Sequence, residues 1–209
     1  AINADGTRNI AEVCEALDCK MLYISTDYVF GGESFDSPIK ETATPAPLGV
    51  YGRTKLLGER AIEESGCDYV IIRTSWLYSS YGNNFVKTMI RLGKERESLG
   101  VIFDQVGTPT YARDLARAIF AAIRQGVVPG IYHFSNEGVC SWYDFTKAIH
   151  RLAGINTCSV KPLHTSEYPT KAKRPHYSVL DKTKIKEIYH IEIPYWMDSL
   201  QSCIAELEA

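Results

Sequence analysis

The sequence predicts an α/β protein built on a doubly wound, parallel, Rossmann-like sheet that lacks its first βα units. Apolar runs of strand length alternate with longer amphipathic segments of helical period along the 209 residues. Because parallel strands need crossover connections, usually helices, this alternation favours a parallel sheet. The chain opens on a helical pattern, and none of its 15 glycines forms a G-x-G-x-x-G turn. We therefore expect this polypeptide to be a fragment whose sheet is missing its start.

The first third of the chain contains two expected helices around one expected strand. A helix over residues 1–17 is indicated by apolar residues at helical spacing, and residues 21–24 form a short, continuously apolar run typical of a buried parallel strand. A Pro-, Ser- and Thr-rich loop over 31–47 follows. We then expect a helix from Tyr51 to about Ser65, stopped by Gly66, with these side chains facing inward: Leu56, Leu57, Ala61 and Ile62.

The rest of the chain continues the alternation. Thr110 is in position to cap a helix over 111–125, and Ser141 with Asp144 forms a capping box for a helix ending near residue 153. The other expected elements are, in order, a strand over 68–73, a helix opening at 83–85, alternating strands over 99–103 and 130–135, a short strand over 159–161, a loop over 168–175, and two short helices within 182–207 broken at Pro194.

Composition excludes several functional classes. A formal net charge of −2 gives no electrostatic reason to expect binding to nucleic acid or to an anionic membrane. No apolar run reaches membrane-spanning length, and no signal-peptide pattern is present, so a cytoplasmic location is the default expectation. The six cysteines and five histidines form no Cys-x-x-Cys pair and no cluster at ligand spacing. We therefore expect reduced thiols and no metal.

A tyrosine and a lysine form the main candidate site. Tyr51 and Lys55 are four residues apart in the expected helix, so their side chains lie on one helical face. A free phenol has a pKa of about 10, and a nearby cation favours its ionised form. This pattern predicts that Tyr51 is a general acid, although the same spacing also occurs by chance on solvated helices.

Hydroxyl and aromatic residues follow two of the expected strands. Ser25 and Thr26 end the strand over 21–24, and Trp76 comes shortly after the strand over 68–73. The carboxyl ends of the strands carry the ligand crevice in open α/β sheets. We therefore expect Thr26 to act with Tyr51, and Trp76 either to stack on a ligand or to belong to the core.

Several ordered motifs carry a family resemblance: Ser-Thr-Asp-Tyr-Val-Phe at 25–30, Pro-Leu-Gly-Val-Tyr-Gly-Arg-Thr-Lys-Leu-Leu-Gly-Glu at 47–59, Arg-Thr-Ser-Trp at 73–76, Asp-Gln-Val-Gly-Thr-Pro-Thr at 104–110 and Arg-Pro at 174–175. Together they resemble the extended short-chain dehydrogenase/reductase family, and within it the branch that reduces 4-keto nucleotide-sugars. The resemblance covers almost the whole chain.

The resemblance implies an interleaved organisation of two lobes. Residues 1–78 and 111–136 would form the remaining part of a dinucleotide-binding domain, and residues 79–110 and 137–209 a smaller substrate-binding lobe. The implied cofactor is NADPH or NADH, and the residue that selects between them would lie upstream of residue 1. The implied partner is a nucleotide-sugar substrate, with no nucleic acid and no membrane, and a homodimer stays open.

The resemblance also assigns roles to individual residues. Thr26 would hydrogen-bond the substrate carbonyl, Tyr51 would donate the proton, and Lys55 would tune Tyr51 and hold the nicotinamide ribose, with Ser25 also on the cofactor side. The implied substrate-binding residues are Asp27, Tyr28, Trp76 and Arg174. Arg174 has the planar fork that suits a phosphate, whereas Lys171 and Lys173 fit an ordinary solvated loop. The implied reaction converts dTDP-4-dehydro-L-rhamnose to dTDP-L-rhamnose.

Alternatives remain at this point. Dehydratases of the family resemble Thr-Asp-Glu at the strand end, where this chain has Tyr28, so elimination lacks its base. A nucleotide-sugar 4-epimerase stays open. The regulatory beta subunit of methionine adenosyltransferase resembles the same branch, so a non-catalytic, partner-binding role also stays open. Because one wall of the crevice would be missing, we expect residues 1–209 alone to bind cofactor weakly and to show no turnover.

Overall fold

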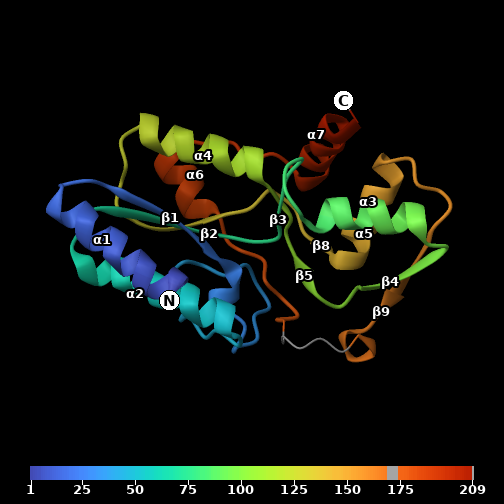
Figure 1. The fold of residues 1–209 in the computed structure, drawn as a ribbon, viewed down its shortest axis with the longest axis horizontal. Coiled ribbons are helices and arrows are strands. Elements are labelled where there is room, and N and C mark those ends of the chain that lie inside the picture. Colours follow the sequence, from blue (N-terminus) through green and yellow to red (C-terminus); the bar gives the residue numbers. More distant parts are fainter. Residues whose placement is uncertain (169–173, 209) are drawn as a thin grey trace.

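A three-stranded parallel sheet positions the candidate residues. The computed structural model describes residues 1–168 and 174–208, and its main sheet has the order β1 (Met21–Thr26), β2 (Tyr69–Thr74), β7 (Gly130–Phe134) (Figure 1). Thr26 lies opposite Thr74, and Thr74 lies opposite Phe134, so the three strands end at one edge. The predicted parallel sheet is confirmed, and this edge carries Thr26.

Helices cover both faces of this sheet. Figure 1 shows α1 (Thr7–Ala16) and α2 (Val50–Ser65) on one side and α4 (Ala112–Arg124) and α6 (Thr183–Tyr189) on the other. Side chains of β2 alternate between the two cores: Ile71 belongs to the buried cluster under α1 and α2, and Val70 and Ile72 to the cluster under α4 and α6. Burial on both faces explains why residues 70–72 of β2 are all apolar.

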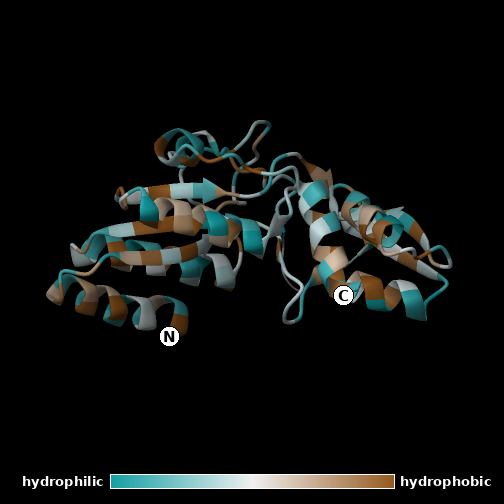
Figure 2. Ribbon diagram, turned by 90° about the horizontal axis from the view of Figure 1, so that it is seen from above, coloured by the Kyte–Doolittle hydropathy of each residue, from teal (hydrophilic) through white to brown (hydrophobic). Residues whose placement is uncertain are grey.

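A second group of elements lies beside the sheet (Figures 1 and 2). It contains α3 (Phe85–Glu95), α5 (Trp142–Leu152), α7 (Trp196–Glu208), and the parallel pair β4 (Ser98–Ile102) and β9 (Ser159–Leu163). The strand expected at 99–103 is therefore present as β4, but it pairs with β9 and not with the main sheet. Its alternating burial fits a strand that is covered on one face only.

Short elements join the two groups. β3 (Leu77–Tyr78) pairs with β6 (Thr110–Tyr111), and β5 (Val106–Gly107) pairs with β8 (Cys140–Ser141). The short helical turns are η1 (Ile2–Gly6), η2 (Asp27–Val29) and η3 (Thr165–Glu167). The prediction that Thr110 caps α4 is wrong: Tyr111 is the N-cap, and the Thr110 hydroxyl accepts a hydrogen bond of 3.3 Å from Thr74. Pairing of β6 with a distant strand takes this hydroxyl away from the helix.

The remaining local predictions mostly agree with the structure. The capping box is confirmed, with Asp144 N donating to Ser141 Oγ over 3.0 Å and Ser141 N donating to Asp144 Oδ2 over 3.0 Å. Gly66 ends α2 in the left-handed conformation, with φ of +83°. Leu57 was expected to face inward but is 49% exposed, because it lies about 100° around the helix from the buried Leu56.

The two ends of the chain also follow the sequence patterns. The first helical pattern is present as η1 and α1, although Ile10, Val13 and Leu17 are exposed. Helix α6 ends before Pro194 and α7 begins after it, as expected. Part of the expected loop 168–175, including Lys171 and Lys173, lies outside the described residues. Within the described ranges, no helix combines the length and the apolar character that crossing a membrane requires.

Candidate active site

A close helix approach brings Tyr51 to the end of β1. Tyr51 lies in the first turn of α2, and Gly52 beside it is buried against η2. A Cβ atom at position 52 would collide with the carbonyl oxygen of Tyr28, so only glycine permits this approach. The side chain before Gly52 is thereby held next to the residues that follow the strand.

Thr26 is fixed by hydrogen bonds at the strand end. Its Oγ1 accepts from the backbone N–H of Tyr28 over 3.2 Å, which makes Thr26 the N-cap of η2. Its hydroxyl is also 3.1 Å from Oδ1 of Asp27. The Thr26 side chain also acts on the Tyr51 phenol, whose pKa it lowers. The structure therefore brings together Thr26 and Tyr51, as the sequence predicted.

Tyr51 keeps a phenol that is protonated at neutral pH. Burial raises the pKa of Tyr51 above 10.0, the negative charge of Asp27 acts in the same direction, and the hydrogen bond from Thr26 opposes both. The residue is 54% exposed, and its ring meets that of Tyr28 edge-on at a centroid distance of 6.0 Å. The Tyr51 side chain is thus partly open to a ligand, while its ring also packs against Tyr28.

Lys55 is held by the strand beneath it. Its Nζ donates to the carbonyl oxygen of Ile24 over 2.6 Å and lies 3.8 Å from the ring centroid of Tyr23. Burial lowers the pKa of Lys55, and Glu59 opposes this shift. The pKa of the Tyr51 phenol is raised, so the lowering expected from the lysine is not seen in the structure. The role of Lys55 toward Tyr51 and a ribose stays a prediction.

Asp27 lies behind Thr26 and is almost fully buried. Burial raises the pKa of Asp27 to about 7, and hydrogen bonds from Thr26, Ser178 and the backbone N–H groups oppose this shift. Within the described ranges, no lysine or arginine forms an ion pair with Asp27. The oxygens of Asp27 thus have partners within the protein. The expectation that Asp27 contacts a substrate directly stays a prediction.

A second buried carboxylate was missed by the sequence analysis. Glu59 accepts hydrogen bonds from Arg73 at Nε over 3.0 Å and at Nη2 over 2.6 Å, and from the hydroxyl of Ser25. All three residues are buried. Ser25 therefore gives its hydroxyl to Glu59, and its role as a cofactor ligand stays a prediction. The signal was a glutamate one helical turn after Lys55 and an arginine ending an apolar strand.

The side chains of Trp76 and Ser178 both lie next to Gly107. Trp76 adopts φ of +46°, a left-handed conformation that is rare for a bulky residue, and its ring stacks on Trp142 with a centroid distance of 3.5 Å. A Cβ atom at Gly107 would lie 2.7 Å from both Trp76 and Ser178, so this glycine lets the two side chains meet. The sequence offered no signal for Ser178, which contacts Asp27 from a distant segment.

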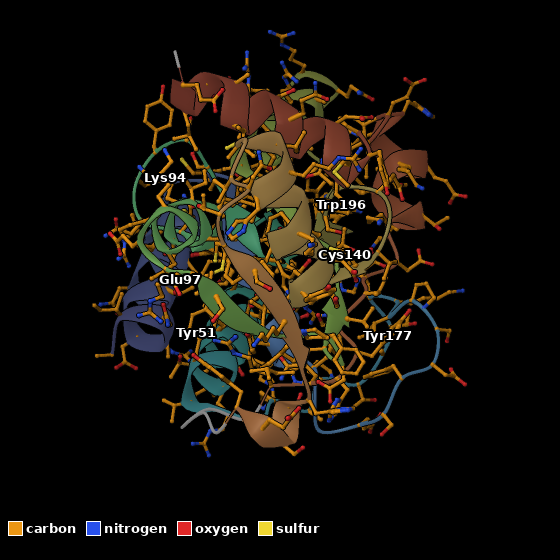
Figure 3. All side chains as sticks on the ribbon, turned by 90° about the vertical axis from the view of Figure 1, so that its right-hand side faces the viewer. Tyr51, Lys94, Glu97, Cys140, Tyr177 and Trp196 are labelled. Carbon is orange, nitrogen blue, oxygen red and sulfur yellow. The ribbon has the colours of Figure 1, made fainter. Side chains whose placement is uncertain are left out.

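A cavity of about 610 Å³ is lined by Arg174 but by none of Thr26, Tyr51 or Lys55. It lies between the loop that contains Gly31 and Leu48 and the segment that contains Arg174 and His176. Arg174 is exposed, and its charge lowers the pKa of Tyr28, which burial raises. Tyr177 lines this cavity. Figure 3 labels Tyr51 and Tyr177 in the lower half of the molecule, on opposite sides of the view. Arg174 therefore lines a cavity, and its role in binding a substrate stays a prediction.

The donor set at this edge suits a nicotinamide nucleotide. Tyr51 and Lys55 present a phenol and a half-buried ammonium beside each other on α2, which are groups that hydrogen-bond a ribose. Among residues 1–168 and 174–208, no three His, Cys, Asp or Glu side chains gather as metal ligands would. The set of Thr26, Tyr51 and Lys55 at the carboxyl edge of this parallel sheet resembles the site of the short-chain dehydrogenases/reductases.

Comparison with known proteins gives the family. The model of the RmlD substrate binding domain matches residues 1–209. The dTDP-4-dehydrorhamnose reductase of Escherichia coli is 41% identical over 99% of this chain and 72% of its own length. The chain belongs to the dTDP-4-dehydrorhamnose reductase family.

Solved structures of relatives share the fold. A dTDP-4-dehydrorhamnose reductase from Bacillus anthracis, in complex with NADP, has a TM-score of 0.91 and 44% identity over 98% of this chain and 72% of its own. One from Clostridium acetobutylicum has a TM-score of 0.93 and 44% identity over 99% of this chain and 72% of its own. The predicted Rossmann-like α/β class is confirmed.

Proposed function

We propose that this chain reduces a 4-keto nucleotide-sugar with NADPH or NADH, converting dTDP-4-dehydro-L-rhamnose to dTDP-L-rhamnose. The observation that carries the proposal is the phenol of Tyr51, half exposed and close enough to Thr26 for that side chain to lower its pKa, at the carboxyl edge of the sheet. The names of relatives that are 41% and 44% identical support the substrate, and the NADP in the Bacillus anthracis structure supports the cofactor.

The proton step follows from the two hydroxyl groups. When bound, the reduced nicotinamide would supply hydride to the carbonyl carbon, and negative charge would then grow on the carbonyl oxygen. Tyr51 donates its proton to that oxygen, because its raised pKa keeps the phenol protonated at neutral pH. Thr26 holds Tyr51 or the carbonyl oxygen by a hydrogen bond. Lys55 and Tyr51 are the residues that would hold the nicotinamide ribose.

We assign the substrate to the side that contains Tyr28, Trp76 and Arg174, and the cofactor to the side that contains Lys55. Tyr28 and Trp76 flank the strand ends, and Arg174 reaches the 610 Å³ cavity with the charge that a diphosphate needs. We assign residues 1–78 and 111–136 to the cofactor side and residues 79–110 and 137–209 to the substrate side. Helix α6 is the part of the second range that packs on the main sheet, through Ile185 and Tyr189. A cytoplasmic location and a homodimer belong to the same proposal.

The decisive test is the substitution Tyr51→Phe. NADPH consumption is followed with dTDP-4-dehydro-L-rhamnose, using residues 1–209 alone and using a fusion protein. The fusion joins these residues, in native order, to the part of the Bacillus anthracis chain outside the match. In the fusion, loss of the general acid should lower kcat by about 10² to 10⁴. Tyr81→Phe, at a tyrosine that is 82% exposed, is the matched control and should not change kcat.

Two outcomes would contradict the proposal. A Tyr51→Phe protein as active as the Tyr81→Phe control would remove Tyr51 from the reaction. Binding of NADPH and the nucleotide-sugar with no turnover in the unsubstituted fusion would favour the regulatory, partner-binding alternative.

A further inference from the structure

The Thr26 hydroxyl has three hydrogen-bonding positions, and three neighbouring groups compete for them. A hydroxyl offers one donor and two acceptor positions. One acceptor position is taken by the backbone N–H of Tyr28, at 3.2 Å. One donor and one acceptor position therefore remain for Asp27, at 3.1 Å, and for Tyr51 on the other side. Whichever role Asp27 takes decides the role left for Tyr51.

The two protonation states of Asp27 give opposite arrangements. An ionised carboxylate can only accept, so it takes the Thr26 hydrogen, and Thr26 can then only accept from the phenol of Tyr51. In that state the Thr26 hydrogen points toward Asp27 and the Tyr51 hydrogen points toward Thr26, so neither faces the substrate. A protonated Asp27 donates to Thr26 instead. The Thr26 hydrogen then points toward Tyr51 or a substrate carbonyl, and the hydrogen of Tyr51 is free to meet the substrate.

We propose that Asp27 is a positioning residue that acts through Thr26, and that its carboxyl must be protonated for the hydroxyl hydrogens of Thr26 and Tyr51 to face the substrate. This inference rests on the proposed reduction. It requires no transfer of the Asp27 proton, because the carboxyl only sets the direction of the hydrogen bonds.

The surroundings of Asp27 place this switch in the working pH range. Among the described residues, the ionisable groups whose pKa the charge of Asp27 raises are Tyr51 from α2 and Tyr28 from its own turn. The segment after residue 173 contributes the neutral hydroxyl of Ser178, and Arg174 acts on Tyr28. The pKa of Asp27 is raised to about 7, whereas both tyrosines have raised pKa values and stay protonated there. The reduction should therefore be active below about pH 7, where Asp27 is protonated, and should lose activity above it.

The test compares pH profiles of kcat between pH 5.5 and 9, each normalised to its own value at pH 6. In the unsubstituted fusion protein, kcat should fall about tenfold per pH unit above the Asp27 pKa. Asp27→Asn should remove this fall, because an amide donates at every pH. Ser178→Ala should move the fall to higher pH, since the Ser178 hydrogen bond lowers the Asp27 pKa. Glu63→Gln, at an exposed carboxylate of α2, should leave the profile unchanged.

A second readout does not depend on turnover. In protein carrying ¹³Cζ-tyrosine, the Tyr51 resonance should shift with a midpoint near pH 7, and this shift should vanish in Asp27→Asn and in Thr26→Val. Identical profiles and shifts in the unsubstituted and Asp27→Asn proteins would overturn the inference while leaving the reduction in place. A missing turnover with the shift present would instead reject the proposed function and keep the hydrogen-bond switch.

Discussion

Two buried carboxyl groups lie near the end of β1, and they differ in their partners. Glu59 is paired with Arg73 through Nε and Nη2, and it also accepts from Ser25. Among residues 1–168 and 174–208, Asp27 has only hydroxyl and backbone N–H donors. Both side chains are at most 3% exposed, so depth of burial does not distinguish them. The difference lies in the presence of a cation.

The presence of a cation distinguishes a carboxylate that stabilises the fold, Glu59, from a carboxyl that can change its charge, Asp27. A buried carboxylate with a bidentate arginine is an ion pair that joins α2 to β2, and it fixes the helix that carries Tyr51 and Lys55. A buried carboxyl without a cation has a raised pKa, near 7 for Asp27, and can therefore change its charge in the working range. Strongly shifted groups of this kind are typical of functional sites.

The largest expected effect comes from breaking the ion pair. Glu59→Gln leaves the buried Arg73 charge without its partner, so the free energy of unfolding should fall by about 3–5 kcal/mol. Urea unfolding at pH 7 measures this loss. Glu63→Gln on the same helix is the matched control and should change stability by less than about 0.5 kcal/mol. An equal, small effect of both substitutions would show that Glu59 does not anchor α2.

A smaller effect on stability is expected at the contact between α2 and η2. In Gly52→Ala, the new Cβ meets the carbonyl oxygen of Tyr28, which should cost about 1–3 kcal/mol. Displacement of Tyr51 from Thr26 should lower kcat in the fusion by about 10². Gly49→Ala is the control, because a Cβ there meets nothing within 4 Å. If both variants lose the same activity, the close approach is not what positions Tyr51.

The sequence predicted those parts of the site that depend on local patterns. Thr26 ends an apolar strand and Tyr51 begins a helix, and parallel topology puts both at one edge, so their meeting was predictable. The capping box of α5 was predictable for the same reason, since Ser141 and Asp144 are three residues apart. Type and spacing of neighbouring residues were sufficient in these cases.

Contacts between distant segments could not be predicted. Thr110 has the residue type of a helix cap, but the pairing of β6 with β3 turns its hydroxyl toward Thr74. Ser178, which lowers the pKa of Asp27, lies about 150 residues away in the sequence. That no cation pairs with Asp27 among the described residues is likewise known only from the folded chain. Lys55 has the expected position on α2, but its ammonium contacts the carbonyl of Ile24.

The measurement that tests this account most directly is the titration of the Asp27 carboxyl. Residues 1–209 are labelled with ¹³Cγ-aspartate, and the resonance that disappears in Asp27→Asn is followed from pH 3 to 9. We expect a midpoint at about 7, because burial disfavours the charged form and no compensating ion pair is present among the described residues. A midpoint near 4, the value of an exposed aspartate, would contradict both the contrast with Glu59 and the proposed switch.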